Sequence, residues 1–160
     1  MNKAYLLLGG NLGDRLQNLQ RALILLQNNS GTIIKKSDIF VTAAWGNEQQ
    51  PDFYNQAVCI ETSLSAADLL KSLLKTEEEL GRKRTNDKWQ ARTMDIDILF
   101  YNDAIINTKE LIIPHPFLQD RRFVLIPLKQ IASEFIHPVL KKTIAQLLVE
   151  CTDRLDVREL

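Results

Sequence analysis

The sequence predicts an α+β protein whose elements follow the order β-α-β-β-α-β, on three observations. Four runs are apolar or rich in β-branched and aromatic residues, as strands are: residues 5–8, 32–42, 53–61 and 94–98. Two segments, 16–26 and 69–80, repeat leucines at helical spacing. The second and third runs follow one another without a helix between them, which favours an antiparallel pair. This order is the split β-α-β arrangement of ferredoxin-like folds, an antiparallel sheet with helices.

Length and composition favour one domain spanning residues 1–160, with 45% hydrophobic and 25% charged residues. The twenty basic and twenty acidic residues cancel, which argues against a general nucleic-acid or membrane-surface binder. No apolar run reaches the roughly 18 residues of a membrane span, and the N-terminus lacks the pattern of a signal peptide. Cys59 and Cys151 lack zinc-site spacing and are expected to be buried free thiols. We therefore expect a cytoplasmic protein.

The first run is predicted to be a buried strand that ends in the turn Gly9–Asp14. Asn11 or Asp14 is placed to cap the helix that follows. The glycines invite comparison with a phosphate-binding loop, but no Lys-Ser/Thr pair follows and the spacing is not G-x-G-x-x-G. A plain strand-to-helix turn is favoured, with phosphate binding as the alternative.

A single strand is expected over Thr32–Thr42, followed by a polar segment and a strand over Phe53–Glu61. Ser63 or Ser65 then caps the second helix. The solvent face of this helix is expected to hold three consecutive glutamates, at 77–79. The first of them is close enough in sequence to pair with the basic loop that follows.

The last third of the chain is less regular and is expected to add a hairpin and short helices. Residues 104–106 and 111–113 form the hairpin, which Pro114-His115-Pro116 ends. The apolar run 123–126 leads into a short helix around Leu128–Ala132. Residues 143–150 form the final helix.

The fourth strand carries the strongest functional signal. From Met94 to Ile98 apolar and acidic residues alternate, so Asp95 and Asp97 share one face, roughly 6.6 Å apart at the backbone. Two carboxylates at that spacing suit a hard divalent cation such as Mg²⁺, and the alternative is the solvated face of an amphipathic strand. A basic cluster upstream suits phosphate and favours a nucleotide-handling site: Arg82, Lys83, Arg84, Lys88 and Arg92.

Six segments follow one another in a telling order: G-G-N-L-G-D (9–14), P-D-F-Y-N-Q-A-V (51–58), G-R-K-R (81–84), W-Q-A-R-T-M-D-I-D-I-L (89–99), P-H-P (114–116) and R-R-F-V-L-I-P-L (121–128). Together they resemble the 6-hydroxymethyl-7,8-dihydropterin pyrophosphokinases of folate biosynthesis, nearly from end to end. The resemblance implies a single Mg²⁺-dependent pyrophosphokinase domain that transfers pyrophosphate from ATP to the hydroxymethyl group of the reduced pterin and releases AMP. A monomer with small-molecule substrates only is expected.

The resemblance also assigns roles to residues of this sequence. It implies that Asp95 and Asp97 hold two Mg²⁺ ions and, with Arg82 and Arg92, carry the chemistry. It assigns the pterin to Thr42, Trp45, Phe53, Asn55, Trp89 and Phe123. It assigns ATP, the co-substrate, to Glu77, Arg82, Arg84, Trp89, Arg92, Ile98, His115 and Arg121.

Elementary chemistry agrees with these assignments. Aromatic faces such as those of Phe53 and Phe123 can sandwich a flat pterin, and Asn55 can read its amide-like edge with one acceptor and two donors. Each residue also has a structural alternative. Phe123 can belong to a core, Asn55 can cap a turn, His115 can be a loop histidine, and Arg121 can lie on the surface.

Departures from the family's usual pattern affect loop dynamics and affinity rather than the reaction. Ala43 and Ala44 stand where prolines are frequent, Phe53 stands for a tyrosine, and Pro116 stands where some members have an aromatic residue. Two rival functions remain, a non-catalytic ferredoxin-like binding domain and another Asp-x-Asp metal enzyme, such as a nucleotidyl or glycosyl transferase. An RNA-recognition domain should carry an aromatic K/R-G-F/Y-type motif, which the sequence lacks.

Overall fold

One antiparallel sheet forms the centre of the molecule in the computed structural model, which describes residues 1–44, 49–81 and 93–160. The strands lie in the order β5-β1-β4-β3-β8, and β2 also pairs with β4. The bounds are Asn2–Gly10 for β1, Thr32–Lys36 for β2, Phe40–Thr42 for β3, Phe53–Thr62 for β4, Asp95–Tyr101 for β5 and Val157–Glu159 for β8. All these pairs are antiparallel, as the sequence predicts.

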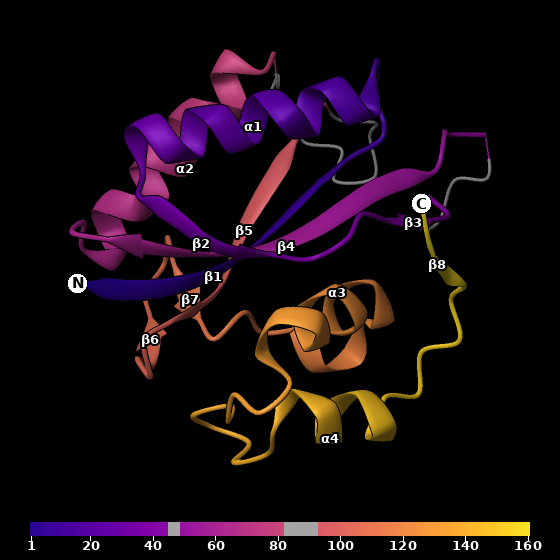
Figure 1. Cartoon of the computed structure of the whole chain (residues 1–160). Helices are drawn as coiled ribbons and strands as arrows, with labels where there is room; N and C mark the ends of the chain where they lie inside the picture. Colours follow the sequence, from indigo (N-terminus) through magenta and orange to yellow (C-terminus); the bar gives the residue numbers. More distant parts are fainter. Residues whose placement is uncertain (45–48, 82–92) are drawn as a thin grey trace.

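Helices cover both faces of this sheet (Figure 1). Helices α1 (Arg15–Asn29) and α2 (Ala66–Glu79) lie on one face, and α3 (Arg122–Ala132) and α4 (Ile144–Glu150) lie on the other. A small hairpin of β6 (Ile106–Asn107) and β7 (Ile112–Ile113) and a 3₁₀ turn at Leu118–Asp120 join β5 to α3. The α+β class and the ferredoxin-like fold are therefore confirmed, although two strands, β2 and β3, stand where the sequence predicts one. No described helix is long and apolar enough to cross a bilayer.

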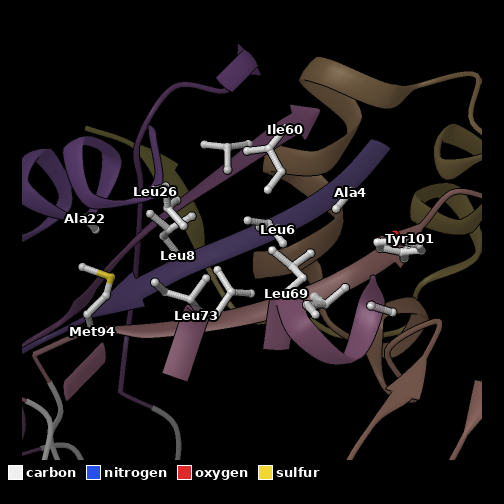
Figure 2. Close-up of a cluster of buried hydrophobic side chains, with 14 of the residues drawn as sticks. Ala4, Leu6, Leu8, Ala22, Leu26, Ile60, Leu69, Leu73, Met94 and Tyr101 are labelled. Carbon is white, nitrogen blue, oxygen red and sulfur yellow. The ribbon is translucent and has the colours of Figure 1, made fainter. Parts of the chain in front are cut away.

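The face under α1 and α2 is closed by a continuous apolar core. Strand β1 contributes Leu6 and Leu8, and α2 contributes Leu69 and Leu73, all of them fully buried. Figure 2 shows these side chains pointing toward one another between the sheet and the two helices. Asp14 caps α1 and Ser65 caps α2, each by accepting a backbone N–H in the first turn, so one of the two predicted candidates is correct in each case.

A second core lies between the sheet and helices α3 and α4. Phe100 of β5 is its largest fully buried member, and it contacts Tyr5 and Phe135 through ring centroids 6.4 and 4.6 Å apart. A register shift opposite Tyr5 and Leu6 lets Leu99 and Phe100 both face this core, although they are neighbours on a strand.

Two expectations about the elements are wrong. The predicted strand Thr32–Thr42 is two strands. The strand is interrupted at Ser37, because the side-chain Oγ of this residue accepts the backbone N–H of Ala57 at 2.9 Å. The helix predicted around Leu128–Ala132 begins earlier, at Arg122, so that the apolar run 123–126 lies inside α3 rather than before it. Cys59 is buried as expected and Cys151 is only half-buried, and both are free.

Candidate active site

A cavity of about 800 Å³ opens on the α3 face of the sheet, beyond the end of the second core. Strands β1, β3, β4 and β5 form its ceiling, and the start of α3 forms a wall. It brings together residues that are far apart in the sequence: Gly9, Thr42, Phe53, Asn55, Asp95, Asp97, Arg121 and Phe123. Seven of these eight are predicted site residues.

Asp95 and Asp97 reach the cavity from strand β5, at the edge of the sheet. Their partners on β1 are Gly9 and Leu7, so both carboxylates point to the cavity face, while Ile96 faces the first core. Among the described residues, no group of three or more His, Cys, Asp or Glu side chains is arranged so that it could hold a metal ion by itself. Two carboxylates fit Mg²⁺, which needs few protein ligands because it keeps waters and binds substrate phosphates.

Asn55 is fixed in place by its neighbours. Only 3% of it is exposed, and its Nδ2 donates to Thr42 Oγ1 at 2.9 Å. A Cβ on Gly9, the paired residue of β1, would lie 2.5 Å from Asn55 Oδ1, so the amide fits only against a glycine. Asn55 lies within strand β4 rather than in a turn, and its amide is oriented before any ligand binds.

Aromatic rings reach the cavity from the sheet and from the helix that covers it. Phe53 begins β4, and Phe123 lies in the first turn of α3, each half-buried rather than enclosed in a core. The guanidinium of Arg121 lies 5.8 Å from the ring centroid of Phe123 and 5.2 Å from that of Phe117, within the range of cation–π contacts. The cavity therefore has aromatic surface and a positive charge in one wall.

His115 borders a smaller neighbouring groove of about 240 Å³ beside the β6–β7 hairpin. Its Nδ1 accepts the backbone N–H of Phe117 at 3.2 Å, which leaves the proton on Nε2. Burial and the nearby Arg121 lower the pKa of His115 to about 4, against an opposing effect of Asp95. The imidazole is therefore neutral at pH 7 and offers one N–H donor.

Two of the residues that the resemblance assigns to ATP, Glu77 and Ile98, do not line the cavity, and their assignment to ATP stays a prediction. Glu77 is 2% exposed, so its predicted place on the solvent face of α2 is wrong, although Glu78 and Glu79 are exposed. Its position four residues after Leu73 and three before Leu80 puts it on the buried stripe of the helix. Ile98 has its side chain in the first core, on the face opposite the cavity. The predictions for Trp45, Arg82, Arg84, Trp89 and Arg92 fall outside the described residues.

Several cavity residues carry no signal in the sequence. In the sequence Gly9 resembles an ordinary glycine of a turn, and only its pairing with Asn55 in the structure explains why a side chain is excluded there. Gln50 and Phe117 also line the cavity, from irregular segments. Thr152, Asp153 and Leu155 do so from a C-terminal segment that shows no motif. Tertiary packing alone assembles this part of the wall.

Comparisons with known proteins show the family of the chain. The model of the 7,8-dihydro-6-hydroxymethylpterin-pyrophosphokinase (HPPK) family matches residues 5–133. The 2-amino-4-hydroxy-6-hydroxymethyldihydropteridine pyrophosphokinase of Aquifex aeolicus is 41% identical over 152 residues, which are 95% of this chain and 94% of the relative. The protein of the same name from Bacillus subtilis is 44% identical over 134 residues, 83% of this chain and 80% of the relative.

A solved structure supports the fold. The wild-type HPPK-DHPS of Plasmodium falciparum matches 94% of this chain with a TM-score of 0.74 and 21% identity, and this chain spans 43% of that longer one. The family match covers well over half of the chain, and the two bacterial relatives match it over most of both lengths. The chain therefore belongs to the 7,8-dihydro-6-hydroxymethylpterin-pyrophosphokinase family.

Proposed function

We propose that this chain transfers a pyrophosphoryl group from ATP to the hydroxymethyl group of 6-hydroxymethyl-7,8-dihydropterin, giving AMP and the pterin diphosphate, in folate biosynthesis. Family membership and the names of the bacterial relatives support the reaction. The observation that carries it is one cavity in which Asp95 and Asp97 lie with Phe53, Asn55 and Phe123. Two acidic groups for a metal and a flat aromatic slot are what this pair of substrates requires.

The pterin is assigned to the aromatic part of the cavity. The rings of Phe53 and Phe123 offer faces on which a flat heteroaromatic stacks. Asn55, already oriented by Thr42, reads the amide-like edge of the pterin through its oxygen and its remaining N–H. The absence of a hydroxyl on Phe53 removes one hydrogen bond that a tyrosine offers, so the stacking contacts and Asn55 carry more of the recognition.

The triphosphate is assigned to the carboxylate end. Asp95 and Asp97 are the residues that would hold Mg²⁺, for which we propose two ions. When bound, Mg²⁺ would supply positive charge that offsets the negative charge of the phosphates. Arg121 adds a planar guanidinium, and neutral His115 adds an N–H donor from the adjacent groove. We also propose phosphate contacts for Arg82, Arg84 and Arg92.

The reaction then needs positioning more than covalent help. The pterin hydroxyl oxygen attacks the β-phosphorus of ATP, and the bond from that phosphorus to the oxygen shared with the α-phosphate breaks. AMP leaves with the bonding electrons, and the hydroxyl proton is released. The chain's own part is to align the two substrates in a partly enclosed cavity, where its fixed charges act more strongly than in water.

Product analysis tests the proposal. Phosphorus nuclear magnetic resonance of a mixture of protein, ATP, Mg²⁺ and the reduced pterin alcohol should show AMP and a pterin diphosphate. Chelation of the metal should stop the reaction, and added Mg²⁺ should restore it. ADP with a pterin monophosphate would contradict the assignment, because the acceptor would then attack the γ-phosphorus.

Other parts of the proposal concern the setting of the enzyme. We infer one pyrophosphokinase domain over residues 1–160, a monomer, in the cytoplasm. The substrates are small molecules, and the balanced charge of the chain supports neither a nucleic-acid nor a membrane partner. The rival interpretations, a binding domain or another Asp-x-Asp transferase, gain no support from the family match.

A further inference from the structure

One wall of the cavity comes from a part of the chain beyond the family match. That match ends at residue 133, whereas Thr152, Asp153 and Leu155 all line the cavity. The segment that carries them contains no helix and ends in strand β8, as Figure 1 shows. Its place is fixed by pairing, because Val157 pairs with Thr42 of β3 and the N–H of Leu160 donates to Ile39 O at 2.9 Å.

Within this segment Asp153 makes two hydrogen bonds of different consequence. Its Oδ1 accepts the N–H of Leu155 at 2.9 Å, a local bond that shapes the segment. Its Oδ2 accepts the N–H of Arg122 at 3.0 Å, and Arg122 is the first residue of α3. Asp153 thus joins the C-terminal segment to the start of a helix 31 positions earlier in the chain.

Helix α3 depends on this contact because its own sequence supplies no cap. The residue at the capping position is Arg121, whose side chain makes no capping hydrogen bond. The first N–H groups of a helix have no partner within the helix, and a carboxylate there also meets the positive end of the helix dipole. Asp153, which is distant in the sequence, therefore supplies the capping hydrogen bond that a serine or aspartate at the capping position usually supplies.

The capped residue lies between two residues of the cavity. Phe123 follows Arg122, and Arg121 precedes it, and both line the cavity. The short side chain of Phe123 moves with the helix backbone, whereas the long side chain of Arg121 can compensate for a small shift. Fixing the start of α3 consequently fixes the ring on which the pterin is proposed to stack.

We propose that Asp153 is a positioning residue for the pterin, acting through the first turn of α3 on Phe123. This inference rests on the proposed function. It assigns to the C-terminal segment a role in substrate affinity, separate from the transfer chemistry at Asp95 and Asp97.

Three variants test it: Asp153→Ala, Asp153→Asn and, as the matched control, Asp156→Ala. Asp156 lies in the same segment with an 83% exposed side chain and pairs with Arg158 at 3.7 Å. The control thus removes the same charge without touching α3. The measurements are the pterin dissociation constant by titration, KM and kcat for both substrates, and the midpoint of thermal unfolding.

For Asp153→Ala we expect the pterin dissociation constant and KM to rise by about five- to tenfold, the size of a lost helix cap, with kcat within about twofold. Asp153→Asn keeps one acceptor and should recover part of the loss. KM for ATP should change less than KM for the pterin, and Asp156→Ala should match the wild type in every measurement.

Other results overturn the inference. They are a lower unfolding midpoint with an unchanged pterin dissociation constant, an asparagine variant no better than alanine, and equal effects in the Asp156 control. Should Asp153→Ala not fold, the same criteria apply to Asp153→Asn. Failure of the proposed function is distinguishable, since the wild type would then form no AMP.

Discussion

On one face of the sheet, β1 presents Ala4, Leu6 and Leu8 to helices α1 and α2, and all three are fully buried. On the other face the same strand presents Leu7 to the second core and then Gly9 to the cavity. The helices on the first face have 15 and 14 residues, whereas those on the second have 11 and 7. In the part of the chain that the structure describes, the cavity opens on the face that carries the shorter pair.

This difference separates stability from chemistry within one sheet. Along β5, the residues that alternate with Asp95 and Asp97 are buried isoleucines of the first core. One strand therefore anchors the fold with one set of side chains and faces the proposed substrates with the other. Substitutions on the two faces should consequently affect different measurements.

The largest effect on turnover is expected on the face of the sheet that carries the cavity. Asp97→Asn or Asp95→Asn should lower turnover by on the order of 10³, because a key electrostatic contribution to the transferred phosphates is lost. The free energy of unfolding should change little, since two carboxylates on one face repel each other. Steady-state kinetics with saturating Mg²⁺ and urea unfolding are the measurements, with the exposed Asp103→Asn as control. Near-normal turnover would show that the two carboxylates are only the solvated face of an amphipathic strand.

The largest loss of stability is expected on the face of the sheet that packs against α1 and α2. Leu73 is fully buried at the centre of the first core, so Leu73→Ala should reduce the free energy of unfolding by about 2–5 kcal/mol. KM for the pterin should stay the same in the folded variant. Ile24→Ala, at a 60% exposed position on α1, is the control and should change stability by less than about 0.5 kcal/mol. A changed pterin KM in Leu73→Ala would show that the two faces are coupled.

An intermediate effect is expected where β1 meets the cavity. Gly9→Ala would place a Cβ 2.5 Å from Asn55 Oδ1, so Asn55 must move and its bond to Thr42 is disturbed. We expect about a tenfold higher pterin dissociation constant, the equivalent of about 1.4 kcal/mol. Gly13→Ala is a matched control, because its φ of +69° makes alanine costly to the fold while leaving Asn55 alone. Equal pterin affinities in both variants would contradict the proposed role of Asn55.

The smallest effect concerns His137, a buried polar residue beside the second core. His137 Nδ1 accepts the N–H groups of Val139 and Leu140, its ring contacts Phe100, and burial lowers its pKa below the ordinary 6.5. The unfolded chain therefore binds a proton below about pH 6.5 that the native protein does not, so stability falls as the pH falls through that value.

His137→Asn should remove this dependence. The stability advantage of the wild type over the variant should be constant above about pH 7 and should shrink toward pH 5. Thermal unfolding in a pH series measures the difference, in which the contribution of His115, of the same sign, cancels. A difference that stays constant over that range would show that His137 does not titrate with unfolding.

The sequence predicted the elements whose side chains follow a regular period. The alternation of Met94–Ile98 placed two carboxylates on one face of a strand, and the leucines at 69–80 predicted the helix α2. Glu77 was misplaced because three adjacent glutamates resemble a solvated face, although the helical period turns the first of them inward. The helical period predicts which residues share a face of the helix. Whether one of these residues is buried depends on the side chains that pack against that face.

Elements without a period could not be predicted. Strand β8 consists of Val157, Arg158 and Glu159, which carry no strand signal by themselves and form a strand because the edge of β3 is available. Asp153 likewise looks like any surface carboxylate until the fold brings it to α3. The aspartate pair was visible in the sequence, whereas the C-terminal part of the cavity wall, made of Thr152, Asp153 and Leu155, was not.

The pairing of β3 with β8 bears on the order in which this protein folds. Residue 40 pairs with residue 159, whereas the central pair of β1 and β4 joins segments about half as far apart along the chain. Contacts between distant segments require a large loop to close before they contribute any stability. The apolar layer under α1 and α2 can thus assemble first and the cavity wall last. A chain in that intermediate state would have its main core yet lack the surface that positions Phe123, so the ability to bind pterin should be acquired at the end of folding.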